Sequence, residues 1–291
     1  MSTHHHLPTS TAYDLWSTVY DTDGNVLQQL DDIYISTILP SLIPQSTSTN
    51  TTENKDEDKD DNTTATTVVE LGCGTGRNTL KLSNMGVNVL AVDNSRGMLD
   101  KLTTKLKKYD GDTTTTTTTT AGDVQVFEVD ITTFSTEAVE AVESEEEERG
   151  DAAAFRTAIN NKRIDGIIST LVLEHIPLRT FFSTASHILP QSSNAWLLLT
   201  NMHESMGAIS SAGFWDEKSQ RKVKPVSYVH TKAEILDEAG KWGFVVVDDE
   251  EGFMRESGVG GDVEDAKGRF GGRAEKWVGV VMHFGVVFRR V

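Results

Sequence analysis

Residues 68–78 read VVELGCGTGRN, an apolar strand followed directly by a turn with glycine at every second position. Glycine lacks a Cβ atom, so Gly72, Gly74 and Gly76 permit a left-handed backbone and a close approach of a ligand to the main chain. Asp93 lies 21 residues beyond Gly72, at the end of the next apolar stretch. A glycine turn followed by an acid at this spacing is typical of a nucleoside site, where the acid accepts hydrogen bonds from the ribose hydroxyls.

Apolar runs and helical periodicity alternate along the rest of the chain. The predicted strands are residues 67–71, 87–92, 124–129, 164–169, 195–200, 244–248 and 276–289. The predicted helices are residues 78–84, 97–109, 178–189 and 232–241. This alternation predicts an α/β fold with a doubly wound, mostly parallel, seven-stranded sheet that binds its ligand at the carboxyl ends of the strands.

The formal net charge of the 291-residue chain is −17; three segments together carry −18, so the rest of the chain is close to neutral. Residues 46–67 contribute −4, residues 137–151 contribute −7 and residues 246–265 contribute −7. The first segment and the threonine run 113–120 have too little apolar surface to offset their ordering entropy. We therefore predict four parts: a tail and helical cap at 1–45, a low-complexity insertion at 46–66, a main domain at 67–291, and flexible insertions within it at 110–122 and 135–162.

Composition also excludes several classes of protein. The single cysteine, Cys73, permits no intramolecular disulfide and no cysteine-rich zinc site, which favours a reducing compartment. The N-terminus lacks the regions of a secretory signal, and no run of about 18 apolar residues occurs. We expect a cytoplasmic protein with no membrane partner and, for want of a basic groove, no nucleic-acid partner.

Two ligand classes fit a glycine turn with a later acid. The dinucleotide fingerprint is G-x-G-x-x-G, and Arg77 stands where its third glycine would be. The Arg77 side chain would obstruct packing near a pyrophosphate, and Glu70 would place a carboxylate beside the phosphates. Acidic groups around the loop better suit a ligand with a cationic amine and a sulfonium.

Four segments, in order and spacing, resemble the class I S-adenosylmethionine-dependent methyltransferases. They are VVELGCGTGRNTLKL, VNVLAVDNSRGMLDKL, FEVDI and IDGIISTLVLEHI. The resemblance covers residues 13–31 and from 66 to the C-terminus, excepting the low-complexity insertions, and its details are similar to fungal methyltransferases of specialised metabolism. It implies a Rossmann-like sheet with an antiparallel last strand, an N-terminal helical cap, and S-adenosylmethionine as the cofactor, with S-adenosylhomocysteine as its product.

The resemblance further implies which residues hold the cofactor. Those expected around its methionine and ribose part are Glu70, Gly72, Gly74 and Gly76, with Arg77 and Asn78 beside them. Those expected at the nucleoside are Asp93 on the ribose hydroxyls, Asn94 and Met98 flanking the adenine, and Asp130 with Ile131 at its amino edge. Those expected at the methyl side are Ser169, Thr170 and Leu171, under an N-terminal cap formed by Tyr13, Trp16 and Tyr20.

The aromatic residues of this cap follow one another at helical spacing. Core packing alone would also explain such a stripe, so the sequence leaves both interpretations open. In the resembling family a similar YDxW…YD segment covers the cofactor, which implies that the cap becomes ordered when the cofactor binds.

Methyl transfer is an in-line displacement at a sulfonium, so placement of the acceptor atom supplies most of the acceleration. A general base is needed only when the acceptor atom holds a proton that it does not lose alone. The candidates for such a base are His203, after the strand 195–200, and His175, after the strand 164–169. His203 is favoured because it begins the long connection 202–229, whose apolar residues suit an acceptor pocket, although a structural role stays open for both.

A metal site is not expected. His4, His5 and His6 are interpreted as an unstructured tail, and no inner set of His, Cys and Asp has the spacing of metal ligands.

Three functions stay open on the sequence. The favoured one is methylation of nitrogen, oxygen or sulfur in a small molecule, such as a secondary metabolite. The second is methylation of a protein or RNA, which is disfavoured because Ser169-Thr170-Leu171-Val172 stands where enzymes acting on planar nitrogens carry Asp/Asn-Pro-Pro-Tyr/Phe. The third is a non-catalytic subunit that binds the cofactor and regulates a partner.

Overall fold

The computed structural model describes residues 4–43, 65–111, 121–134, 150–247 and 252–291. Its helices are α1 (Thr9–Trp16), α2 (Val26–Leu42), α3 (Arg77–Asn84), α4 (Arg96–Gly111), α6 (Asp151–Asn161), α7 (Leu178–Ile188), α8 (Glu204–Gly207), α9 (Lys232–Lys241) and α10 (Val263–Phe270), with the 3-10 segments η1 (Ile131–Phe134), η2 (Leu173–His175) and η4 (Gly272–Trp277). Its strands are β1 (His4–His6), β2 (Thr67–Leu71), β3 (Asn88–Asp93), β4 (Val124–Glu128), β5 (Gly166–Thr170), β6 (Ser192–Met202), β7 (Phe214–Asp216), β8 (Arg221–Lys224), β9 (Phe244–Val246), β10 (Arg255–Ser257) and β11 (His283–Arg290).

The main sheet has the strand order β10-β11-β6-β5-β2-β3-β4, with β9 also paired to β11. The pairings from β4 through β3, β2 and β5 to β6 are parallel, and β11 runs antiparallel to β6. The order reverses between β2 and β5, so the carboxyl ends of these strands border the crevice where a sheet of this type binds ligands. The predicted doubly wound α/β fold is therefore confirmed.

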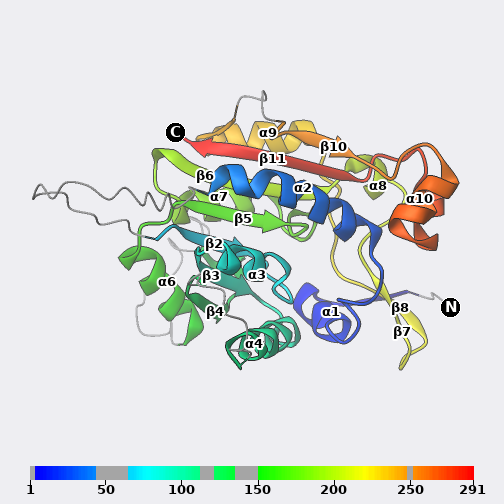
Figure 1. Cartoon of the computed structure of the whole chain (residues 1–291), viewed down its shortest axis with the longest axis horizontal. Coiled ribbons are helices and arrows are strands. Elements are labelled where there is room, and N and C mark those ends of the chain that lie inside the picture. The colour runs from blue at the N-terminus through cyan, green and yellow to red at the C-terminus, as the bar shows by residue number, and fades with distance from the viewer. Residues whose placement is uncertain (1–3, 44–64, 112–120, 135–149, 248–251) are drawn as a thin grey trace, which may run out of the picture.

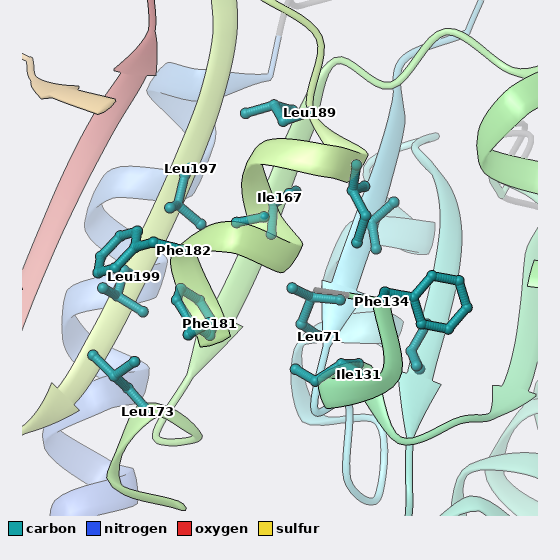
Figure 2. Close-up of a cluster of buried hydrophobic side chains, with 14 of the residues drawn as sticks. Leu71, Ile131, Phe134, Ile167, Leu173, Phe181, Phe182, Leu189, Leu197 and Leu199 are labelled. Atoms are coloured by element: carbon teal, nitrogen blue, oxygen red, sulfur yellow. The ribbon is translucent and has the colours of Figure 1, made fainter. Parts of the chain in front are cut away.

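Alternation along the strands explains why helices cover both faces of the sheet (Figure 1). Val69 and Ile167 face a core that includes α7 and α9, whereas their neighbours Val68 and Ile168 face α2, α3 and α4. On the α7 side, Phe181 packs toward the strand residues (Figure 2). Because both faces are buried, these strands read as continuous apolar runs in the sequence.

All seven predicted strands occur in the sheet, but the described residues form eight strands there rather than seven, and the prediction for the last one was too long. Its predicted start at residue 276 is wrong, because Gly272–Trp277 forms η4 and β11 begins at His283. The short strand β10, which the sequence did not predict, shares an edge with β9: each pairs with a different end of β11.

The predicted insertion at 135–162 also extends too far. Residues 151–161 form α6, whose Phe155 is fully buried and packs against Phe127 and Phe134. The low-complexity insertion 46–66, the threonine run and the acidic residues 137–149 lie mostly or wholly outside the described residues.

The N-terminus is more structured than the sequence predicted. Residues His4–His6 form β1, which pairs in parallel with β8, and β8 pairs with β7 in a second, three-stranded sheet. The interpretation of the three histidines as an unstructured tail is therefore wrong. Among the helices that the structure describes, none combines the length and apolarity needed to cross a membrane.

Candidate active site

A cavity of about 360 Å³ opens at the carboxyl ends of the central strands. Each of four strands contributes residues to it. They are Gly72 and Gly74 after β2, Asp93 and Asn94 at the end of β3, Asp130 and Ile131 after β4, and Thr170 and Leu171 at the end of β5. With Tyr13 and Tyr20 of the N-terminal cap, the structure thus brings together at one cavity ten of the residues that the sequence assigned to the cofactor.

The glycine loop is held against the end of β3 by its backbone. The N–H groups of Gly72 and Cys73 both donate to the carbonyl oxygen of Val92, at 2.8 and 2.9 Å. Gly72 has φ of 75°, and a Cβ atom there would lie 2.2 Å from Cγ2 of Val172. Gly74 has φ of 54° and faces open space, where a Cβ atom would meet nothing within 4 Å. Because these residues have no side chain, a ligand in the cavity can approach their backbone closely.

Asp93 is fixed by the same loop. One carboxylate oxygen accepts from the N–H of Gly74 and the other from the N–H of Ser95, both at 2.8 Å. Burial raises the pKa of Asp93 to about 6, although these backbone hydrogen bonds act to lower it. Its carboxylate is therefore ionised at neutral pH and held in a fixed orientation beside the cavity.

The N-terminal cap contains two Tyr-Asp pairs, Tyr13-Asp14 and Tyr20-Asp21, in which the tyrosine lines the cavity and the aspartate binds the scaffold. The tyrosines, Tyr13 and Tyr20, line the cavity. The aspartates fasten the cap to the scaffold: Asp14 accepts from Ser95 Oγ at 2.7 Å and from the N–H of Gly97 at 2.8 Å. Asp21 likewise accepts from Thr75 Oγ1 at 2.6 Å and pairs with Lys105 at 2.9 Å. The cap is thus attached to the glycine loop and to the start of α4.

His175 lies in the wall of the cavity with both ring nitrogens engaged. Its Nδ1–H donates to the carbonyl oxygen of Val226 at 2.6 Å, and its Nε2 accepts from the hydroxyl of Tyr13 at 2.8 Å. Burial lowers the pKa of His175 to about 4, so the ring is neutral near pH 7. A ring with no free lone pair orients Tyr13 rather than accepting a proton from a substrate.

A second, smaller cavity of about 110 Å³ adjoins the first, and the two share Tyr13, Tyr20 and Leu171 as lining residues. Trp16, which the sequence assigned to the cofactor, lines only this smaller cavity. Its indole N–H donates to Asp23 at 2.9 Å and its ring stacks on Phe214. Trp16 therefore belongs to the compartment beside the expected cofactor site.

Several residues that the sequence assigned to the cofactor line neither cavity and support the glycine loop instead. Glu70 is buried and accepts from Thr79 Oγ1 at 2.5 Å, which ties β2 to α3. Gly76 has φ of 86° and no room for a Cβ atom, which would lie 2.3 Å from Leu102. Ser169 donates to the carbonyl oxygen of Leu71 at 3.0 Å. Met98 packs in the core under α1, so its predicted place beside an adenine is wrong.

Arg77 and Asn78 also point away from the cavities. Arg77 pairs with Asp31 and Asp32 of α2, and both Arg77 and Asn78 donate to Thr170 Oγ1. In the structure they join α3 to α2 and to the end of β5, and their assignment as cofactor ligands stays a prediction.

The placement of His203 gives no support to its role as the general base, which stays a prediction. Its Nδ1 accepts from the N–H of Ser205 at 3.1 Å, which makes it the N-cap of α8, and it lines neither cavity. Its Nε2 faces Glu204 and Glu256, each at 3.8 Å. The His203 ring therefore contacts the start of α8 and Glu256 rather than either cavity.

Sequence reasoning missed several lining residues. Residues 8–10 at the start of α1 and Val226 line the larger cavity, and Glu174, Lys222 and Arg273 line the smaller one. Glu174 directly precedes His175 in the fourth motif, so its position was a usable signal. Lys222 and Val226 lie in the connection 202–229, which was predicted to form an acceptor pocket. Residues 8–10 and Arg273 reach the site through tertiary packing that no local pattern encodes.

Within the described ranges, no group of three or more His, Cys, Asp or Glu side chains is placed to hold a metal ion.

The geometry defines a nucleoside-binding α/β enzyme with a second compartment, and comparisons with known proteins specify it. Residues 68–156 match the family model described as a methyltransferase domain. The chain is 36% identical over 288 residues to the uncharacterized methyltransferase AN0656 of Emericella nidulans, covering 97% of this chain and 90% of that protein. The chain therefore belongs to the class I S-adenosylmethionine-dependent methyltransferases, as the sequence resemblance implied.

Solved structures agree with this fold. A complex of DhpI with SAH has a TM-score of 0.53 at 12% identity, over 97% of this chain and 94% of that chain. A complex named DhpI-SAM-HEP has a TM-score of 0.51 at 13% identity, over 96% and 94% of the two chains. At such identities the likeness establishes the fold, and family membership makes S-adenosylmethionine the cofactor.

Proposed function

We propose that this enzyme transfers the methyl group of S-adenosylmethionine to a nitrogen, oxygen or sulfur atom of a small molecule of specialised metabolism. The observation that carries the proposal is the pair of adjoining cavities with shared lining residues Tyr13, Tyr20 and Leu171. The larger one has the acid and glycines that suit a nucleoside, and the smaller one is lined in part by Trp16 and Tyr20 of the N-terminal cap. A protein or RNA acceptor would call for an open surface instead.

In this proposal the larger cavity holds the cofactor. Asp93 accepts hydrogen bonds from the ribose hydroxyls, and Gly72 and Gly74 leave room for the chain that links ribose to sulfur. Asn94, Asp130 and Ile131 surround the adenine. When bound, the cofactor supplies an electrophilic methyl group on a sulfonium. Thr170 and Leu171 lie on the side from which the acceptor approaches.

The residues shared by the cavities position the acceptor. The Tyr13 hydroxyl donates a hydrogen bond to His175, which fixes its orientation. Its oxygen keeps lone pairs that can accept a hydrogen bond from the molecule to be methylated. Burial raises the pKa of Tyr13 well above its usual value, so it stays a neutral hydroxyl. Placement of this kind is enough to accelerate an in-line transfer without a dedicated base.

The type of acceptor can be tested with radiolabelled cofactor. The purified enzyme is incubated with a fungal cell extract and S-adenosylmethionine labelled in the methyl group, and the extract is then separated into small molecules, protein and nucleic acid. We expect label in the small-molecule fraction. Label confined to protein or RNA would establish the second function, and no transfer despite intact cofactor binding would establish a non-catalytic subunit.

The affinity for S-adenosylhomocysteine is expected to fall by about tenfold between pH 7.5 and pH 5. The ribose hydroxyls donate to the ionised form of Asp93, whose pKa is about 6, so protonation below that pH removes the better acceptor. Calorimetry at the two pH values measures the change. The Asp93→Asn variant, which has no carboxylate to protonate, should bind weakly at both, and an unchanged pH dependence in that variant would refute the assignment.

Limited proteolysis tests whether the cap closes over the cofactor. Cleavage within residues 10–40 should slow when S-adenosylhomocysteine is present, because Tyr13 and Tyr20 line its cavity. Asp14→Ala removes the acceptor for Ser95 and Gly97 and should speed cleavage in the free enzyme. Asp100→Ala, at an exposed position on α4, serves as the control. Equal cleavage rates with and without the ligand would contradict a closing cap.

A further inference from the structure

The smaller cavity is lined by three cationic side chains from two separate segments, β8 and η4. Lys222 comes from β8, and Arg273 and Lys276 come from η4. The Lys276 ammonium lies 4.6 Å from the centre of the Trp277 ring, and Arg273 donates to the carbonyl oxygen of Asp23. Among the ion pairs of the described residues, none involves Lys222 or Lys276.

The three cations lie close enough to act on one another. The pKa of Lys222 is lowered, first by its partial burial and then by the charges of Lys224, Lys276 and Arg273. Lys222 is half-buried, whereas Arg273 and Lys276 are exposed, and like charges gathered at one cavity repel one another. This repulsion costs free energy in the empty site. A bound anion would lower it, because it would neutralise several of these charges together.

Two acids face the same cavity, and they do not balance the cations. Asp23 accepts from the indole N–H of Trp16 and is near Arg273. Glu174 is 4% exposed, and one of its carboxyl oxygens has no hydrogen-bond partner. Burial raises the pKa of Glu174 to about 8, so it is mostly uncharged at neutral pH and offers a proton donor. The net charge lining the cavity is therefore positive, although the chain as a whole is strongly acidic.

We propose that the methyl acceptor carries an acidic group, a carboxylate or a phosphate ester, that Lys222, Arg273 and Lys276 bind in the smaller cavity. The inference rests on the proposed function, since it identifies this cavity as the acceptor site. The aromatic walls formed by Trp16, Tyr20 and Trp277 contact the apolar body of the acceptor. The acidic group lies at the cationic side, which leaves the rest of the molecule directed toward the shared residues Tyr13 and Leu171.

The experiment measures binding of simple probes to the full-length enzyme saturated with S-adenosylhomocysteine. The probes are 4-hydroxyphenylacetate, phenyl phosphate and the neutral 4-hydroxyphenylacetamide, titrated by calorimetry. We expect at least one of the two acids to bind at least about tenfold more tightly than the amide, and its affinity to fall as salt is added. A preference for the first acid identifies a carboxylate site, and a preference for the second a phosphate ester site.

Matched variants separate the local cations from the overall charge. The double change Lys222→Gln and Lys276→Gln should weaken binding of the preferred acid by about tenfold or more and leave the amide unaffected. The control is Lys107→Gln with Lys108→Gln, which removes the same charge from exposed positions on α4. Equal binding of acids and amide, or equal losses in the two double variants, would overturn the proposal. Absence of S-adenosylhomocysteine binding in the unmodified enzyme would instead overturn the proposed function.

Discussion

Replacing Asp93 with alanine is expected to weaken S-adenosylhomocysteine binding by at least about 100-fold. A hydrogen bond to a charged group contributes roughly 1.5–3 kcal/mol, and the ribose offers two hydroxyls to this carboxylate. A loss of about 1.4 kcal/mol is already tenfold in affinity. The carboxylate is held in place beforehand by the N–H groups of Gly74 and Ser95, so the ligand does not bear the cost of orienting it. Calorimetry on the purified variant measures the effect.

Two controls separate the lost contact from a damaged loop. Thermal unfolding of the free Asp93→Ala variant reports how far the loop depends on the carboxylate. Asp100→Ala, at an exposed position on α4, should bind the ligand as the unmodified enzyme does. If Asp93→Ala kept an affinity within about threefold of the original, the ribose would have to bind elsewhere.

Gly72→Ala is expected to lower the free energy of unfolding by about 2–4 kcal/mol. The new Cβ atom would lie 2.2 Å from Cγ2 of Val172, and φ of 75° is a conformation that alanine adopts only with strain. Relief requires Val172 to move, and this residue lines the cofactor cavity. The variant should therefore lose cofactor affinity together with stability, which denaturant unfolding and calorimetry can measure side by side.

Gly74→Ala is the matched control for this change. Gly74 also has a positive φ, of 54°, but a Cβ atom there meets nothing within 4 Å. It should cost only the backbone strain of about 1–2 kcal/mol in the absence of ligand. Equal destabilisation by the two substitutions would show that close packing on Val172 does not matter.

The sheet was predictable because each central strand is buried on both faces. Such strands read as short apolar runs, and the residues that end them, such as Gly72, Asp93 and Asp130, mark the site directly. The boundaries that failed have a different cause. Residues 151–161 contain only two buried apolar side chains, Phe155 and Ile159, too few to stand out beside the acidic run that precedes them.

The candidate site was predictable only where the motif residues themselves touch the cavity. Within the motif, the sequence cannot separate a residue that faces a ligand from one that braces the loop, and Arg77 and Met98 are of the second kind. His203 was assigned for its position after a strand and its chemistry, whereas its orientation is set by the N-terminus of α8. Arg273 carries no local signal, since folding brings η4 to the cavity, whereas Lys222 lies within the connection 202–229 that was predicted to form an acceptor pocket.

The net charge of −17 did not predict the cationic lining of the smaller cavity. The acidic residues are concentrated in three segments of the sequence, and the smaller cavity is lined by more cations than ionised acids. The charges that line the cavity act on a ligand at short range, whereas salt screens the charges of distant segments, so the local charge decides which ligand binds.

The central claim is that the cavity at the ends of β2 to β5 binds S-adenosylmethionine. Calorimetric titration of the full-length enzyme with S-adenosylmethionine, S-adenosylhomocysteine and NAD⁺ tests it most directly. The account predicts that both sulfur ligands bind, that Asp93→Ala abolishes most of this affinity, and that NAD⁺ does not bind. Binding of NAD⁺ in place of both sulfur ligands, or of none of the three, would contradict it.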